Sequence, residues 1–169
     1  PILNFGIQSS FEYKRLNLTM NFAGASMQTF IMNNDLKIPF YSNGASTKKL
    51  LTDRWHREDP FDPNSKWIPG FYPPTRKDLP NHSNFSRTNT FYLINIKYLR
   101  LRDLEIGYNL PSKLVQRLKI DNLRVYTNIS CLFSIDNVKK YNIDPEINVS
   151  SGLTVPQTRA FNFGFICNL

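Results

Sequence analysis

The sequence predicts an all-β protein whose strands pair in an antiparallel sheet. Aromatic residues are frequent, with 13 Phe, 8 Tyr and 2 Trp among 169 residues, and aromatic side chains favour strands. Five stretches alternate apolar and polar residues, as strands with two different faces do. Short and long connections follow each other between these stretches, which indicates antiparallel neighbours.

The first two strands are predicted over residues 2–13 and 15–29, joined by a tight turn at 13–15. Apolar residues occupy odd positions in the first strand and even positions in the second, and only Ser9 interrupts the first pattern. Two such runs around a very short link predict a β-hairpin.

A long loop is predicted over residues 30–90, because Pro, Asn and Ser recur throughout it and only 47–55 has a helical pattern. The third strand is predicted over 91–109. Leu99 and Leu101 are apolar at odd positions, whereas Leu104 and Ile106 are apolar at even ones. We expect a β-bulge near Arg102 and Asp103 to absorb the extra residue.

The last two strands are predicted over 122–135 and 159–169. A short turn over 110–121 precedes the first of them, and a loop over 136–158 separates the two. Strands of about 10 to 17 residues suit a tilted crossing of a bilayer. The sheet is therefore predicted to be a segment of a transmembrane β-barrel, with short periplasmic turns and long extracellular loops.

A soluble β-sandwich is the alternative fold, since its strands also alternate. Against it, the polar face is rich in Asn, Ser, Thr and Arg, and the apolar face is rich in aromatic residues at its ends. Phe11, Tyr13 and Tyr108 lie where an aromatic girdle at the periplasmic interface is expected. No run of 18 apolar residues offers a membrane helix.

Several functional classes find no support in the sequence. The net charge is +8, but the basic residues are scattered and no recognition motif accompanies them, so nucleic acid is not an expected partner. Cys131 and Cys167 have no metal-ligand spacing, and no cofactor or metal is expected. No nucleophile elbow or phosphate-binding glycine loop appears, so the protein is not expected to be an enzyme.

One motif is specific enough to name a family. The stretch YLRLRDLEIGYNLP from Tyr98 to Pro111 resembles the signature near the end of SusC/RagA-type TonB-dependent outer-membrane transporters. The same order of motifs continues with Leu132-Phe133, Asp144-Pro145-Glu146 and Phe161-Asn-Phe-Gly164. The chain departs from the family at Cys131, where Asn is usual, and at Leu169, where Phe is usual.

The resemblance implies that this chain forms the last five strands of a plugged barrel of about 22 strands. It further implies active import of oligosaccharides or peptides across a bacterial outer membrane of the Bacteroidetes type, with the C-terminus periplasmic. Implied partners are the rest of the barrel and its plug, a SusD-like lipoprotein, the inner-membrane TonB complex and outer-membrane lipid. A passive porin and a surface-exposed binding module or adhesin remain alternatives.

Candidate sites fall into three groups. Aromatic residues of the long loop are candidates for stacking on a substrate or on the lipoprotein, although simple loop packing is an equal alternative; they are Trp55, Trp67, Phe71 and Tyr72. Arg100 and Arg102 are predicted to face the lumen. Asp144 and Glu146 flank a Pro and are candidates for binding a cation, but two carboxylates fall short of a calcium shell, so a turn is the favoured interpretation.

Overall fold

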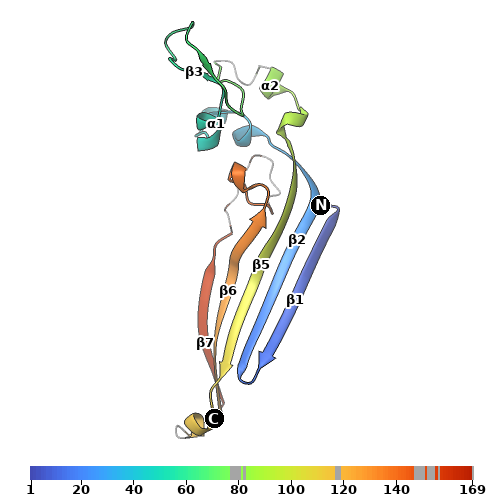
Figure 1. Cartoon of the computed structure of the whole chain (residues 1–169), viewed down its shortest axis with the longest axis vertical. Helices are drawn as coiled ribbons and strands as arrows, with labels where there is room; N and C mark the ends of the chain where they lie inside the picture. Colours follow the sequence, from blue (N-terminus) through green and yellow to red (C-terminus); the bar gives the residue numbers. More distant parts are fainter. Residues whose placement is uncertain are drawn as a thin grey trace. The chain divides into compact units, whose positions relative to one another are not determined.

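The computed structural model describes residues 1–76, 81, 83–116, 119–146, 151, 155 and 157–168. Its main element is a five-stranded antiparallel sheet in the order β1-β2-β5-β6-β7 (Figure 1). The strands are β1 (Leu3–Tyr13), β2 (Leu16–Ile31), β5 (Leu93–Asn109), β6 (Asn122–Asp136) and β7 (Ala160–Asn168). The predicted all-β class is confirmed.

Short elements make up the remaining regular structure. A second sheet pairs β3 (His56–Arg57) with β4 (Trp67–Ile68). The helices are α1 (Lys48–Thr52), α2 (Ser83–Ser86) and α3 (Ser112–Val115), and the 3-10 turns are Asn34–Leu36, Tyr41–Asn43, Thr90–Tyr92 and Lys139–Tyr141. No helix among the described residues is long and apolar enough to cross a membrane.

The chain forms two compact units. The sheet unit comprises Pro1–Gln28, Ile96–Asn137 and Pro156–Leu169, and the loop unit comprises Thr29–Asn95 and Val138–Val155. In the loop unit, Ile38 and Phe85 are buried against each other with Tyr41 packed beside them. The side chain of Thr47 accepts a hydrogen bond from the backbone N–H of Leu50 and so caps α1, which satisfies a donor that the first helical turn leaves free.

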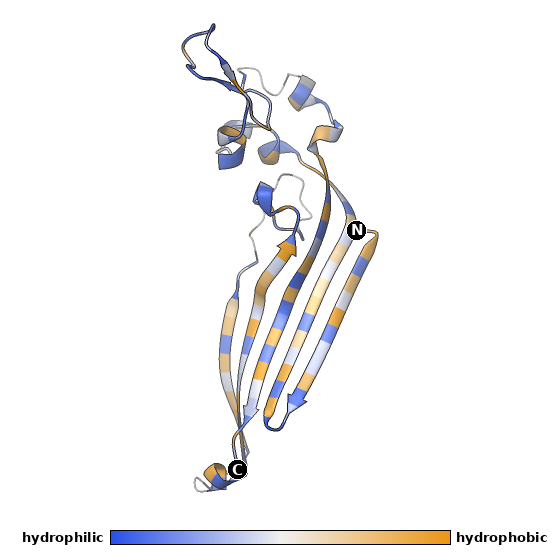
Figure 2. Cartoon of the chain, in the orientation of Figure 1, coloured by the Kyte–Doolittle hydropathy of each residue, from blue (hydrophilic) through white to orange (hydrophobic). Residues whose placement is uncertain are grey.

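Strand pairing preserves the alternation seen in the sequence, because residues directly opposite each other in a sheet share a face. Phe11 lies opposite Leu18, Ile106 opposite Thr127, and Val125 opposite Phe165. Figure 2 shows the resulting alternation of hydrophobic and hydrophilic residues along the strands. The sheet unit therefore has one largely apolar and one largely polar face.

The predicted bulge is present, but the extra residue is in the partner strand. Between the pairs Leu101–Phe133 and Asp103–Ser130, Arg102 alone faces both Cys131 and Leu132. Cys131 has a φ of 53°, a left-handed conformation that an extended strand does not allow. The pairing of β6 with β7 ends at Ser130, so the bulge also marks where β7 joins the sheet.

Observed boundaries differ from the expected ones by a few residues. The third strand begins at Leu93 and not at 91, because Phe91 and Tyr92 belong to a 3-10 turn that the Asn89 side chain caps by accepting a hydrogen bond from the Phe91 N–H. The second strand continues to Ile31, beyond the expected end at 29. Leu169 and part of the loop over 136–158 lie outside the described residues.

Candidate functional site

The apolar face of the sheet unit is covered with exposed aromatic and aliphatic side chains. Phe163 and Phe165 in β7 are 82% and 72% exposed, and Phe11 in β1 is 58% exposed. Exposure of apolar surface to water costs about 25 cal/mol per Å², and contiguous apolar patches of this kind indicate a membrane or a protein partner. Such a face suits contact with lipid acyl chains.

The polar face carries an ordered network of charged and aromatic side chains. Arg124 Nη2 donates to Glu105 Oε1 at 2.6 Å, and its guanidinium lies 5.5 Å from the centre of the Tyr126 ring. These long side chains lie across glycines of the neighbouring strands, since a Cβ at Gly107 would meet the Arg124 guanidinium and one at Gly164 the Tyr126 ring. The network gives this face a polar surface held in a defined arrangement.

Arg100 and Arg102 lie beside the bulge. Arg100 is only 5% exposed, and its Nη1 donates to Gln157 Oε1 at 2.7 Å. The same oxygen lies 3.2 Å from Cys131 Sγ. Gln157 thus connects the segment before β7 to the bulge, a contact between distant residues that the sequence did not indicate. A lumen-facing role for both arginines stays a prediction.

The four candidate aromatic residues lie in the loop unit, on two segments that are joined by a parallel bridge between Arg54 and Tyr72 and by the antiparallel pair of β3 and β4. The backbone N–H of Trp55 donates to Tyr72 O at 2.9 Å, and that of Tyr72 to Asp53 O at 2.9 Å. The Asp53 carboxylate also accepts from the Phe71 N–H at 3.0 Å. Trp67 in β4 is covered on one side by the Arg57 guanidinium, 4.3 Å from the ring centre, a cation–π contact.

Exposure separates these four rings. Trp55, Trp67 and Phe71 are between 42% and 45% exposed, whereas Tyr72 is only 4% exposed. The burial of Tyr72 favours a packing role for that ring. For all four, contact with a ligand or a lipoprotein stays a prediction.

The structure adds three aromatic residues that sequence reasoning missed. The Phe91 ring stacks on Phe71 with the ring centres 4.9 Å apart, Tyr92 meets Phe91 edge to face, and Tyr141 approaches Phe71 at 6.5 Å. Offset and edge-to-face pairs at these distances contribute about 0.5–1.5 kcal/mol each beyond burial. In the sequence, Phe91 and Tyr92 adjoin the alternating pattern of the third strand, which predicts strand and not a turn for them.

Burial raises the pKa of Tyr72 to about 12 from its ordinary value of 10.0, and Tyr141 and Asp53 add to the shift. The pKa of Tyr92 is likewise raised to about 12, mainly by burial. A raised pKa means that folding favours the neutral phenol, so its contribution is complete below pH 10 and is lost as the pH rises towards 12.

We therefore expect the loop unit to lose stability between pH 10 and pH 12, and the Tyr72→Phe variant to lose less over the same range. Amide hydrogen exchange in the loop unit at rising pH, corrected for the intrinsic exchange rate, measures this difference. Equal losses in the variant and the unchanged protein would contradict the assigned role of the Tyr72 phenol.

A buried lysine joins two segments of the loop unit. Lys37 is 4% exposed, its Nζ donates to Arg87 O at 2.8 Å, and it lies 5.1 Å from the centre of the Tyr92 ring. Burial lowers the pKa of this ammonium, because a low-dielectric environment disfavours the charged form. The contact holds the first 3-10 turn of the long loop to the segment that leads into β5.

Asp144 and Glu146 form a local turn. The Asp144 carboxylate accepts a hydrogen bond from the Glu146 N–H at 2.9 Å, the geometry of an Asx turn. Within the described ranges, no group of three or more His, Cys, Asp or Glu side chains is placed to hold a metal ion. The turn accounts for the spacing of these two carboxylates.

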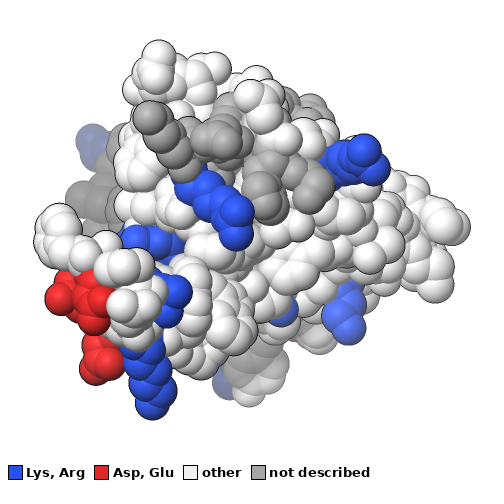
Figure 3. Space-filling model, turned by 90° about the horizontal axis from the view of Figure 1, so that it is seen from above, with Lys and Arg blue, Asp and Glu red and all other residues white. Residues whose placement is uncertain are grey.

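Basic side chains do not form one surface on the face seen from above. Figure 3 shows Lys and Arg at several separate places with uncharged residues between them. A nucleic-acid interface usually requires a continuous basic patch or stripe, and the described residues drawn on this face do not form one.

Together, five antiparallel strands with one exposed apolar face and one ordered polar face have the architecture of a β-barrel segment. Comparison with solved structures shows which proteins have a similar fold. The chain matches the RagAB peptide importer in its open-open state with a TM-score of 0.61 and 21% identity, covering 98% of this chain. It matches the closed-closed state with a TM-score of 0.60 and 23% identity over 94% of this chain, and a RagAB peptide transporter structure with a TM-score of 0.56 and 22% identity over 96%.

This likeness confirms, at the level of the fold, the resemblance to SusC/RagA-type transporters that the motif from Tyr98 to Pro111 predicted. The chain spans 16–17% of the length of the importer chains it matches. No protein-family model matches the sequence, and no curated protein matches it.

Proposed function

We propose that this chain is the last five strands of a TonB-dependent importer in a bacterial outer membrane. The observation that carries the proposal is the exposed apolar face of the five-stranded sheet, together with its likeness to RagAB importer chains. The edge strands β1 and β7 have no further strand beyond them among the described residues. In hydrocarbon, unpaired backbone groups cost several kcal/mol each, so both edges require pairing with the remainder of a barrel of about 22 strands.

The connections of the sheet unit support one orientation in the membrane. The two-residue β1–β2 turn and the connection containing α3 lie at one end of the sheet unit, as the hydrogen bond from Asn109 N to Arg15 O shows. In the proposed orientation this end is periplasmic and the long connections over 30–90 and 136–158 are extracellular. The C-terminal end of β7 is then periplasmic.

The proposed substrates are oligopeptides or oligosaccharides, and the peptide importers among the structural neighbours favour peptides as the first class to test. A SusD-like lipoprotein is the proposed extracellular partner, and the inner-membrane TonB complex, acting on the plug, is the proposed energy source. Transport, and not catalysis, is the role assigned to this chain.

Energised uptake is the test of this function. Cells that carry the full-length protein are expected to accumulate labelled oligopeptides or oligosaccharides, whereas cells without it, and cells treated with a protonophore, are not. Uptake that continues after the proton-motive force has collapsed would indicate a passive porin. A detergent-free soluble protein of native size that takes up neither substrate would indicate a binding module or adhesin.

A second experiment, the intact mass of the native species, tests whether this chain is part of a larger protein. The C-terminal peptide from Ala160 onward is expected in a detergent-extracted chain, or a stable complex, several times larger than 19.7 kDa. The same preparation shows whether a lipoprotein copurifies.

A further inference from the structure

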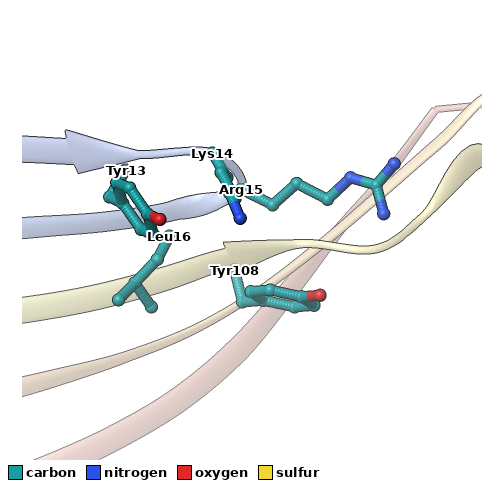
Figure 4. Close-up of a pocket in the computed structure, with 5 residues that line it drawn as sticks. All are labelled: Tyr13, Lys14, Arg15, Leu16 and Tyr108. Atoms are coloured by element: carbon teal, nitrogen blue, oxygen red, sulfur yellow. The ribbon is translucent and has the colours of Figure 1, made fainter.

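The tip of the β1–β2 hairpin forms a cavity between two strand ends. Tyr13 pairs with Leu16, which leaves Lys14 and Arg15 as the two turn residues. The Arg15 carbonyl accepts a hydrogen bond from the Asn109 N–H at 2.9 Å, which fixes the turn against the end of β5. The resulting open cavity of about 570 Å³ is lined by Tyr13, Lys14, Arg15, Leu16 and Tyr108 (Figure 4).

The two cations at this cavity are available to an external anion. Neither Lys14 nor Arg15 forms an ion pair within the part of the chain that the structure describes. Lys14 Nζ lies 5.2 Å from the centre of the Tyr13 ring. Figure 4 shows the Arg15 side chain and the Tyr108 ring extending in the same direction beyond the strand ends.

The backbone at Lys14 is strained. Its φ of 56° is a left-handed conformation that Gly, Asn and Asp adopt much more readily than Lys. A better turn former at this position would make a more stable hairpin, so the presence of Lys points to a use for its side chain. Backbone strain of this kind is concentrated at binding and catalytic sites.

The cavity also has an apolar side, formed by Leu16. Leu16 lines the cavity and shares a face with Leu18 and Phe11. Leu16 and Phe11 are exposed and Leu18 is half-buried, so the apolar surface continues along the hairpin. A free phosphate ion would gain nothing from contact with this apolar surface, because it has no apolar part. A molecule with an anionic head and attached acyl chains fits both parts, since the cations and tyrosine hydroxyls would contact the head and the chains would lie on the apolar face.

We propose that the cavity formed by Tyr13, Lys14, Arg15, Leu16 and Tyr108 binds the phosphate head of an anionic phospholipid of the inner leaflet. The proposal rests on the membrane placement given under the proposed function. In this arrangement an ordered lipid lies at the tip of the hairpin, and the side chains of Lys14 and Arg15 bind its phosphate.

Native mass spectrometry of the full-length protein in detergent, titrated with phosphatidylglycerol, tests this site. The variant Lys14→Gln with Arg15→Gln is expected to bind about 30-fold more weakly, the factor expected for two basic side chains at a lipid surface. The control, Lys113→Gln with Lys119→Gln, removes the same charge from the β5–β6 connection, outside the cavity, and is expected to bind as the unchanged protein does.

Three results would overturn the proposal: unchanged lipid binding in the hairpin variant, equal loss in the control variant, or displacement of the lipid by inorganic phosphate. The single variant Lys14→Asn separates binding from structure, because Asn tolerates the left-handed turn. It is expected to make the protein more resistant to denaturant while binding the lipid more weakly, and a loss of both would indicate a purely structural role. Failure of the unchanged protein to enter membranes would contradict the proposed transporter function instead.

Discussion

Replacing Phe163 by Arg is expected to destabilise the membrane-inserted protein by about 2–4 kcal/mol, the cost of a guanidinium near the middle of the bilayer on the lipid face of a barrel strand. Phe163 lies near the middle of β7, pairs with Thr127, and is 82% exposed on the apolar face. Equilibrium unfolding of the full-length protein from phospholipid vesicles measures the difference.

The adjacent Asn162→Arg variant is the matched control, because Asn162 pairs with Asn128 on the polar face of the same strand. It is expected to leave the free energy of unfolding close to that of the unchanged protein. If both variants lost the same stability, the two faces would not differ in their environment, and the assignment of the apolar face to lipid would be wrong.

The Gly70→Ala variant is expected to destabilise the packing of the loop unit by about 1–3 kcal/mol, the usual cost of forcing extra volume into a packed site. A Cβ at Gly70 would overlap the backbone carbonyl of Arg54. This close approach allows Trp55 to donate to Tyr72 O and Tyr72 to Asp53 O. With a Cβ at position 70, the segments that carry Trp55, Phe71 and Tyr72 must separate.

Amide hydrogen exchange at Trp55 and Tyr72 reports this change directly, and both amides are expected to exchange faster in the variant. Gly6→Ala provides the control, since a Cβ at Gly6 meets only Phe22 O at an ordinary 3.6 Å. Unchanged exchange at both amides in Gly70→Ala would show that the two segments do not approach each other as described.

The sequence suggests four loop aromatics as candidates for a site, but it does not show which side chains they contact. The loop aromatics Trp55, Trp67, Phe71 and Tyr72 were selected by residue type alone. Phe71 contacts Phe91 and Tyr141, and Phe91 in turn contacts Tyr92. All three residues are distant from Phe71 in the sequence. Ring stacking depends on which segments meet in space, and no local pattern records that.

The sequence by itself determined the five strands, the tight turn at Lys14 and Arg15, and the two unlike faces. It could do so because side-chain alternation is a property of each strand alone. Its motif from Tyr98 to Pro111 also predicted the barrel fold that the comparison confirmed.

Only the tertiary structure decided which strand carries the bulge, which side chain meets Arg100, and what surrounds the hairpin tip. The phase change in β5 suggested an extra residue near Arg102, whereas the register shows that β6 holds it at Cys131 and Leu132. A bulge is a difference between the lengths of two paired strands, so it can be assigned only when both strands are seen together. The same reason applies to Gln157, which reaches Arg100 across 57 residues of chain.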